Sequence, residues 1–197
     1  MFLENTINHS KQSGWMEVIC GSMFSGKTEE LIRRLRRAEM AGQNVEIFKP
    51  KTDTRYSEED VVSHNKNKIR STAVENPNEI ILLGSNCDVV GIDEAQFFDE
   101  SIVEVANQLA NNGIRVVIAG LDMDFLGRPF GPIPNLMATA EYVTKVHAIC
   151  KRTGNLANYS MRTSQGNNLV ELGETESYEA VSRRVFIEEV LSKRNND

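Results

Sequence analysis

The stretch GSMFSGKT, from Gly21 to Thr28, follows the apolar segment WMEVIC at residues 15–20 and precedes a run with helical periodicity. It matches the pattern G-x-x-x-x-G-K-[ST] in full, between a predicted strand and a predicted helix. Glycine at two loop positions lets main-chain N–H groups turn inward, and the start of the following helix adds partial positive charge. These features indicate a loop that binds the phosphates of a nucleotide.

The side chains of this loop add specific chemistry. Lys27 is long enough to reach the outer phosphates, and the Thr28 hydroxyl can be a ligand of Mg²⁺. The alternative is a chance glycine turn before a helix, but the flanking strand and helix favour nucleotide binding. The residues predicted to contact the nucleotide phosphates are Gly21, Ser22, Met23, Phe24, Ser25, Gly26, Lys27 and Thr28.

Strand-like and helix-like patterns alternate over the first two thirds of the chain. The predicted strands cover residues 15–20, 44–50, 86–96 and 114–120, and the predicted helices start at Lys27 and span 100–113. Residues 51–79 are polar and predict a long loop. This alternation predicts an α/β fold with a parallel sheet flanked by helices. Together with the phosphate-binding loop it indicates a P-loop NTPase, which we expect to be RecA-like.

The pattern changes after residue 140. Apolar segments at 142–150 and 167–173 predict strands of a smaller lobe, separated by a polar turn. We therefore expect a disordered leader at 1–14, a nucleotide-binding domain at 15–140, a lid domain at 141–187 and a polar tail at 188–197.

Composition narrows the class of protein. The chain has 197 residues, of which 40% are hydrophobic and 25% charged, as in an ordinary globular protein. Its net charge of −6 argues against a nucleic-acid partner, because proteins that bind nucleic acid usually present a basic surface. Cys20, Cys87 and Cys150 are too far apart to suggest a disulfide framework. Neither a signal peptide nor an apolar run of roughly 18 residues is present, so we expect a cytoplasmic protein without a membrane segment.

A second chemical element is VVGIDEAQFF, at residues 89–98. An apolar strand that delivers Asp93 at its carboxyl end fits the acid that holds Mg²⁺ in P-loop proteins. Glu94 lies next to it and is placed to take a proton from an attacking hydroxyl or water. The alternative of a solvated loop is less favoured, because these acids directly follow a buried strand.

Several classes of P-loop protein remain to be separated. The string D-E-A-Q suggests a helicase, but the chain has neither a second lobe of similar size nor a basic groove. A regulatory GTPase would need N-K-x-D, and Asn65-Lys66-Asn67-Lys68 lacks the Asp. A kinase for a small hydroxylated acceptor fits better. A P-loop motor or switch, and a nucleotide-binding protein without catalysis, stay as alternatives.

The combined motifs resemble the type II thymidine kinases, the family of the human cytosolic enzyme and of many bacterial enzymes. The resemblance runs in the family's order from about residue 15 to residue 187. The matching segments are MEVICGSMFSGKTEELIRRLRRA, KPKTDTRYS, SH at 63–64, GIDEAQFF, GLDMDF with RPFG, and GETESYE.

The resemblance implies Mg²⁺-dependent transfer of a phosphoryl group from ATP to the 5′-hydroxyl of thymidine, and of deoxyuridine, in deoxynucleotide salvage. Glu94 matches the family's proton acceptor. Asp93 and Gln96 match positions around the metal and the phosphates, and Asp53 and Arg55 match a pair near the phosphates and the acceptor. The resemblance also implies a homotetramer and feedback inhibition by thymidine triphosphate (dTTP).

A pocket for the thymine base follows from the same resemblance. Ser160 matches a small residue near the pyrimidine methyl group, and Tyr178 matches a residue that closes the site. The apolar walls match Met23, Phe97, Leu121 and Phe125, and the main chain that bonds the base edge matches Leu169, Val170, Glu171, Leu172 and Gly173. For Phe98 and Phe130 we prefer core packing.

The chain departs from the family at the lid. Where the family carries four zinc-binding cysteines, this sequence has Cys150, Thr153, Ser182 and Val185. Three of these cannot supply a thiolate, so we predict no structural zinc. The lid is then expected to be held by packing and by hydrogen bonds from polar residues such as Thr153, Asn155 and Asn158.

Two further features are interpreted as structural. The run RRLRR at 33–37 lies on a predicted helix with Leu35 facing inward, so a solvated face or a subunit contact is favoured over a polyanion site. His64 lies in the long polar loop, where nothing in the sequence provides a partner, and we assign it no catalytic role.

Overall fold

Six parallel strands form the central sheet of the computed structural model, which describes residues 13–51, 60–62, 68–163 and 177–194. Their order is β5-β2-β6-β7-β1-β8, and each neighbouring pair runs in parallel. The strands are β1 (Trp15–Gly21), β2 (Val45–Pro50), β5 (Thr72–Val74), β6 (Val89–Ile92), β7 (Arg115–Leu121) and β8 (Tyr142–Lys145). A separate antiparallel pair joins β3 (Asp60–Val62) to β4 (Lys68–Arg70).

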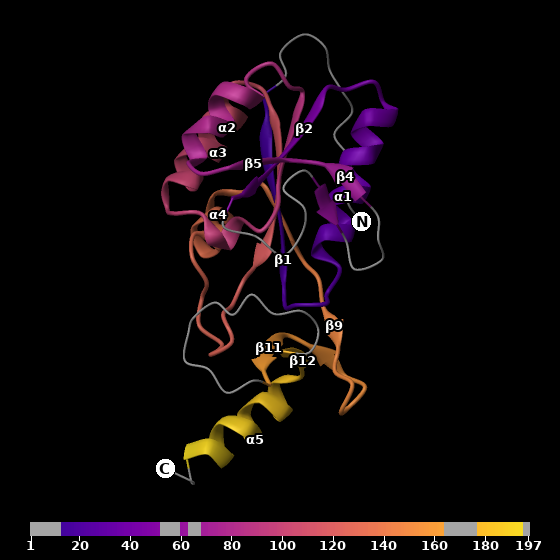
Figure 1. The fold of residues 1–197 in the computed structure, drawn as a ribbon, viewed down its shortest axis with the longest axis vertical. Helices are drawn as coiled ribbons and strands as arrows, with labels where there is room; N and C mark the ends of the chain where they lie inside the picture. The colour runs from indigo at the N-terminus through magenta and orange to yellow at the C-terminus, as the bar shows by residue number, and fades with distance from the viewer. Residues whose placement is uncertain (1–12, 52–59, 63–67, 164–176, 195–197) are drawn as a thin grey trace.

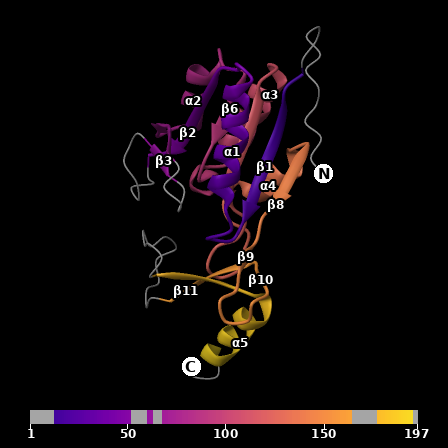
Figure 2. The ribbon, with the colours of Figure 1, turned by 90° about the vertical axis from the view of Figure 1, so that its right-hand side faces the viewer.

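Helices cover both faces of this sheet (Figures 1 and 2). On one face lies α1 (Lys27–Met40), and on the other lie α2 (Pro77–Gly84), α3 (Ser101–Asn111) and α4 (Ile133–Thr139). Alternate strand residues point to opposite faces, so that Val18 packs with the α3 side and Ile19 with α1. The predicted α/β architecture with a parallel sheet is therefore confirmed.

Several predicted elements match the structure closely. The strands expected at 15–20, 44–50 and 114–120 and the helices expected from Lys27 and over 100–113 are present, with ends within two residues. The strand expected at 86–96 is shorter, because it ends at Ile92 and a tight turn, η1 (Ala95–Phe97), follows. Phe98 is buried in the core, as expected.

The interpretation of residues 51–79 as one long loop is wrong. Besides β3 and β4, the segment supplies β5, an edge strand of the main sheet, and the start of α2. The Asn76 side chain accepts a hydrogen bond from the Asn78 N–H, and the Glu79 side chain accepts one from the Asn76 N–H. This capping box, followed by Pro77 at the first turn, is a helix start that the polar composition obscured.

The strand expected at 142–150 is divided into two. Its first part, β8, pairs with β1 and so belongs to the central sheet rather than to the lid. Its last part, β9 (Ala148–Ile149), pairs with β10 (Leu156–Ala157) in the smaller lobe. The lid lobe therefore begins after Lys145, later than the expected boundary at residue 141.

The lid lobe lies beyond the carboxyl ends of β1 and β8, at the lower end of Figures 1 and 2. It contains two antiparallel pairs, β9–β10 and β11 (Tyr159–Arg162) with β12 (Tyr178–Val181), followed by α5 (Arg183–Arg194). These elements enclose a small core, which includes Cys150, Tyr159 and Val185, and Phe24 and Met123 of the body pack against it. Helix α5 runs through residues that were expected to form part of the polar tail.

Some expectations fall on residues outside the described part. These include residues 1–12 of the leader expected at 1–14, and the strand expected at 167–173. Among the helices that the structure describes, none is long and apolar enough to cross a bilayer.

The arginine run at 33–37 is not a uniformly solvated face. Leu35 points inward as expected, but Arg34 is also buried, and its guanidinium lies 2.8 Å from carboxylate oxygens of Glu17 and Glu30. Glu17 is fully buried in β1 and also pairs with Arg115 at 2.7 Å. A charged residue this deep in a protein requires such partners, so Arg34 serves the internal packing of α1 against the sheet.

Candidate active site

The site is built where three neighbouring strands end. Strands β6, β7 and β1 are adjacent in the sheet and parallel, so their carboxyl ends deliver the chain to the same edge. Beyond this edge lie the P-loop at residues 21–28, the segment 93–97 and the loop 121–131. In open α/β sheets, the crevice outside the carboxyl ends of the strands is where ligands bind.

The backbone of the P-loop adopts conformations that its glycines permit. Gly21 and Gly26 have φ angles of 147° and 86°, and a Cβ atom on Gly21 would collide with the Val146 carbonyl oxygen. Phe24 also has a positive φ, 61°, which is uncommon for a residue with a side chain. Strain of this kind concentrates at functional sites, and here it shapes the loop that the sequence predicted to hold phosphates.

The cationic side chain of the loop is held close to its main chain. The Lys27 ammonium donates to the Ser22 carbonyl at 2.8 Å, and the Ser25 hydroxyl donates to the same oxygen at 2.7 Å. Lys27 begins α1, so it stands at the positive end of the helix dipole. This places a positive charge and the helix terminus together at the mouth of the loop.

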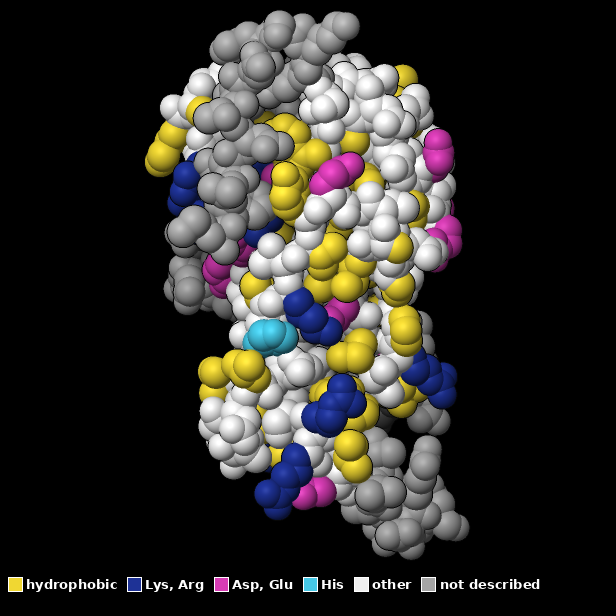
Figure 3. Space-filling view, turned by 180° about the vertical axis from the view of Figure 1, so that it is seen from behind, with side chains coloured by type: hydrophobic (Ala, Val, Ile, Leu, Met, Phe, Trp, Pro, Cys, Tyr) yellow, Lys and Arg dark blue, Asp and Glu magenta, His cyan; other side chains and the backbone are white. Residues whose placement is uncertain are grey.

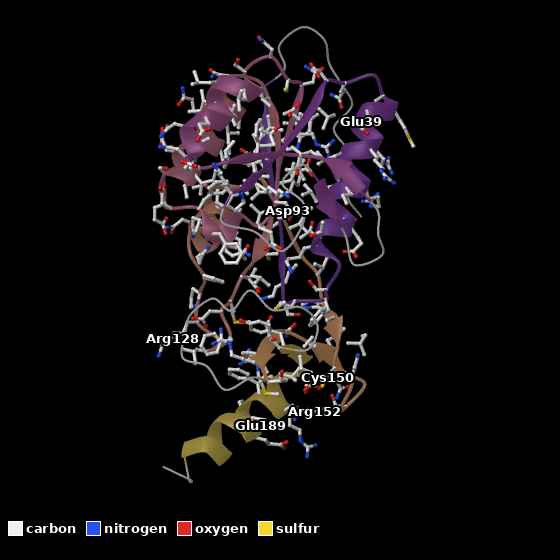
Figure 4. All side chains as sticks on the ribbon, in the orientation of Figure 1. Glu39, Asp93, Arg128, Cys150, Arg152 and Glu189 are labelled. Atoms are coloured by element: carbon white, nitrogen blue, oxygen red, sulfur yellow. The ribbon has the colours of Figure 1, made fainter. Side chains whose placement is uncertain are left out.

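A hydroxyl and a carboxylate meet beside the P-loop. Thr28 Oγ1 lies 3.4 Å from Asp93 Oδ2, and Asp93, labelled in Figure 4, is almost entirely buried. The other Asp93 oxygen accepts a hydrogen bond from the Glu94 N–H at 3.0 Å. Two oxygen donors at this position fit a Mg²⁺ ion that takes its remaining ligands from phosphates and water.

The Glu94 carboxylate is oriented by a chain of hydrogen bonds. The Leu121 main-chain N–H donates to Gln96 Oε1 at 2.9 Å, and Gln96 Nε2 donates to Glu94 Oε2. Because a main-chain N–H can only donate, it fixes which end of the Gln96 amide is oxygen and turns the NH₂ toward Glu94. Glu94 itself has a φ of 51°, a strained value for a glutamate. The sequence predicted Gln96 near the phosphates but did not reveal this support for Glu94.

The residues predicted to surround a base come from both lobes. Met23 lies in the P-loop, Leu121 ends β7, and Phe125 follows in the next loop, whereas Ser160 and Tyr178 lie on β11 and β12. Ser160 Oγ accepts a hydrogen bond from the Met23 N–H at 2.9 Å, which joins the two lobes directly.

Phe97, which is predicted to form a pocket wall, contacts Phe130, and several other predicted site residues lie outside the described part of the chain. Phe97 packs edge-on against Phe130, with ring centroids 5.8 Å apart, so Phe130 supports a predicted pocket wall and is itself only half-buried. Outside the described residues lie Asp53, Arg55, His64 and the segment Leu169, Val170, Glu171, Leu172 and Gly173.

A second hydrogen bond ties the P-loop to the lid. The Ser22 hydroxyl donates to the Ala157 carbonyl of β10 at 3.0 Å, and Ser22 is buried. Together with the Met23–Ser160 hydrogen bond, it means that two consecutive P-loop residues bond to the lid. The phosphate loop and the lid lobe are therefore in direct contact.

The strand end beneath the P-loop carries an ion pair. The Asp122 carboxylate, at the end of β7, lies 2.6 Å from the Lys145 ammonium at the end of β8, and these two strands flank β1. Burial and the neighbouring Asp122 charge raise the pKa of the Cys20 thiol, at the end of β1, to about 11. Cys20 is therefore a neutral core thiol rather than a nucleophile.

The four positions where the family carries zinc ligands lie together in the lid. Cys150 is buried, and although burial opposes its ionisation, hydrogen bonds from the Thr153 hydroxyl and from main-chain N–H groups of Ser182, Arg152 and Thr153 lower its pKa to about 7. Thr153 Oγ1 lies 3.5 Å from Ser182 Oγ, and Val185 packs in the lid core. The arrangement supplies one sulfur and two hydroxyls where a closed zinc site needs four strong ligands.

An arginine between these positions connects three parts of the lid. Arg152 lies 2.6 Å from a Glu179 oxygen of β12 and 2.7 Å from a Glu189 oxygen of α5. Figure 4 shows Arg152 and Glu189 close to Cys150, and Figure 3 shows Lys and Arg side chains at and below the narrowing between the two lobes. This cluster joins the turn after Cys150 to the elements that carry Ser182 and Val185.

Replacing Arg152 with Met tests whether this cluster stabilises the lid. An exposed ion-pair network contributes about 0.5–1 kcal/mol, so amide hydrogen exchange in β12 should accelerate about two- to fivefold. Exchange in β1 and β7 should not change. The matched control is Arg184→Met, which removes the exposed pair with Glu188 within α5. Equal exchange in the two variants would contradict the role given to Arg152.

The sequence matches proteins of one known family over most of its length. The family model "Thymidine kinase" matches residues 14–186. A thymidine kinase of Porphyromonas gingivalis is 62% identical over 93% of this chain and 90% of its own length. One of Bacteroides thetaiotaomicron is 59% identical over 95% of this chain and 94% of its own length.

Similar solved structures include the genome packaging NTPase B204 of Sulfolobus turreted icosahedral virus 2. The match has a TM-score of 0.47 and 15% sequence identity, and it covers 72% of this chain and 78% of that chain. Family membership follows from the sequence matches alone, which extend over both lobes. With the P-loop, the Asp93–Glu94 pair and strands β9 to β12 of the lid inside the matched range, the chain belongs to the thymidine kinase family.

Proposed function

We propose that this protein transfers the γ-phosphoryl group of ATP to the 5′-hydroxyl of thymidine, and of deoxyuridine, with Glu94 as the general base. The observation that carries the proposal is the oriented Glu94 carboxylate. It is held by Gln96 beside Asp93, at the same sheet edge as the P-loop. The names of the relatives support thymidine as the acceptor, and the geometry of the site supports the residues that are proposed to act on it.

Each residue of the phosphate site has a distinct task in this proposal. The P-loop main chain and Lys27 bind the phosphates of ATP, and the Thr28 hydroxyl and Asp93 carboxylate hold Mg²⁺. When bound, Mg²⁺ would neutralise charge on the phosphate oxygens. Glu94 takes the proton of the 5′-hydroxyl as that oxygen attacks the γ-phosphorus, and the γ-phosphoryl bond to the leaving ADP oxygen breaks.

The nucleoside is proposed to bind between the lobes. Phe97, Leu121 and Phe125 approach from the sheet side, and Ser160 and Tyr178 approach from the lid side. Support comes from the hydrogen bond between Ser160 and the Met23 N–H, which brings the two sides into contact. Motif matches alone support roles for Asp53 and Arg55 near the phosphates and for the main chain of 169–173 at the base edge.

The remaining parts of the proposal rest on the family. They are a cytoplasmic homotetramer that acts in deoxynucleotide salvage, without a nucleic-acid partner, and feedback inhibition by dTTP. An end product that shares the thymidine moiety would compete for the same pocket, which is the physical reason for expecting inhibition.

A transfer assay with labelled ATP tests the function and the base together. The wild-type protein should label thymidine and deoxyuridine, and Glu94→Gln should lower kcat about 100- to 10,000-fold while leaving the KM for ATP nearly unchanged, because only proton removal is lost. Glu104→Gln, at an exposed glutamate of α3, is the control. Labelling of deoxycytidine or purine nucleosides instead, or full activity of Glu94→Gln, would contradict the proposal.

Metal analysis of the purified protein tests the lid separately. Since three of the family's four ligand positions lack a thiolate, we expect far less than one zinc per chain after purification without chelators. The Cys150→Ala variant should have the same zinc content as the wild type. One zinc per wild-type chain would overturn the prediction of a zinc-free lid.

A further inference from the structure

Strand β11 presents two polar side chains on the face that meets the body. Residues two apart on a strand share a face, so Ser160 and Arg162 point the same way. Ser160 faces the P-loop, because its hydroxyl accepts from the Met23 N–H. Arg162 therefore lies on the pocket side of β11, whereas Tyr159, on the other face, stacks on Phe186 in the lid core.

Arg162 contacts two aromatic residues of the proposed nucleoside pocket. Its guanidinium carbon lies 4.1 Å from the centroid of the Phe125 ring and 5.4 Å from that of the Tyr178 ring. Its Nη2 donates to the Tyr178 hydroxyl at 2.8 Å. Tyr178 is directly opposite Arg162 in the β11–β12 pair, so the register of the two strands sets up this contact.

The two aromatic residues come from different lobes. Phe125 lies in the loop after β7, whose shape is fixed by Asp124, a buried carboxylate that accepts hydrogen bonds from the N–H groups of Leu126 and Arg128 at 2.9 Å. Tyr178 belongs to β12 of the lid. Arg162 is only 6% exposed and joins a rigid loop of the body to a strand of the lid.

We propose that Arg162 is a positioning residue for nucleoside binding, a role that rests on the function proposed above. A cation over the face of an aromatic ring is attracted to it, so Arg162 holds the Phe125 ring from one side. The hydrogen bond to the Tyr178 hydroxyl sets the orientation of the second ring. Arg162 thereby fixes the two aromatic walls relative to each other before the planar base enters, which reduces the entropy lost on binding.

This role differs from general support of the lid. A second arginine of the lid, Arg183, also lies over an aromatic ring, with its guanidinium carbon 5.2 Å from the Tyr159 centroid. Arg183 is exposed, and Tyr159 lies on the face of β11 opposite to Ser160 and Arg162, in the lid core and next to Gly127 of the loop after β7. The chain thus offers a matched pair of arginine–aromatic contacts, one on the pocket side and one on the opposite side.

Steady-state kinetics of Arg162→Met and Arg183→Met separate the two roles. Arg162→Met should raise the KM for thymidine about tenfold, leave the KM for ATP within about twofold and change kcat less than it changes the thymidine KM. Arg162→Lys, which keeps the charge but not the planar group, should recover part of the loss. Arg183→Met should leave both KM values unchanged.

A double-mutant cycle with Tyr178→Phe tests the path of the effect. If Arg162 acts partly through the Tyr178 hydroxyl, Arg162→Met should cost less in the Tyr178→Phe background than in the wild type. Should Arg162→Met fail to fold, Arg162→Lys and Tyr178→Phe carry the test, each with an expected rise of about threefold in the thymidine KM. Unchanged thymidine KM values in the folded variants, or equal rises for both substrates, would overturn the proposal.

Calorimetric binding of thymidine distinguishes this proposal from the proposed function. If the wild-type protein binds thymidine without phosphorylating it, the proposed function is contradicted. The role of Arg162 is then tested by thymidine binding alone, and Arg162→Met should raise the Kd for thymidine about tenfold. A wild-type protein that does not bind thymidine contradicts both proposals.

Discussion

The hydrogen bond from the Leu121 main-chain N–H to the Gln96 side chain organises the active site. It selects one orientation of the Gln96 amide, and that orientation directs an N–H donor at the Glu94 carboxylate. The space for the Gln96 side chain depends on a missing Cβ at Gly120, where such an atom would lie 2.9 Å from Gln96 Oε1. In the proposed reaction, a Glu94 carboxylate that is already oriented needs less rearrangement before it takes the proton.

The order of the strands explains why this arrangement is possible. With β6, β7 and β1 adjacent and parallel, Glu94, Leu121 and the P-loop emerge side by side although they are far apart in the sequence. The lid then closes the same edge through hydrogen bonds to Ser22 and Met23.

Features dictated by local sequence were predictable. The P-loop motif and its flanking elements, the Asp93–Glu94 pair at a strand end and the inward face of α1 follow from short-range patterns. The capping box at residues 76–79 is equally local, but it lies in a segment whose polar composition predicts a loop. Arg34 was placed on a solvated face because its partner Glu17 is distant in sequence and buried in a strand.

Features that depend on contacts between distant segments could not be predicted. The division of 142–150 between the sheet and the lid follows from the pairing of β8 with β1. The role of Gln96 depends on a main-chain group of β7, and that of Arg162 depends on a ring in the loop after β7. In the lid, Arg152 pairs with Glu179 and Glu189, which are 27 and 37 residues away in the sequence. Such contacts become visible only when the chain is folded.

The most direct test of the account is the coupling between Gln96 and Glu94 in turnover. Gln96→Leu should lower kcat about 100-fold with little change in either KM, because it releases the Glu94 carboxylate without removing it. In the Glu94→Gln background the same substitution should have almost no further effect on kcat, since there is no base left to orient. Independent, multiplying losses in the double variant, or a Gln96→Leu protein with wild-type kcat, would contradict the account.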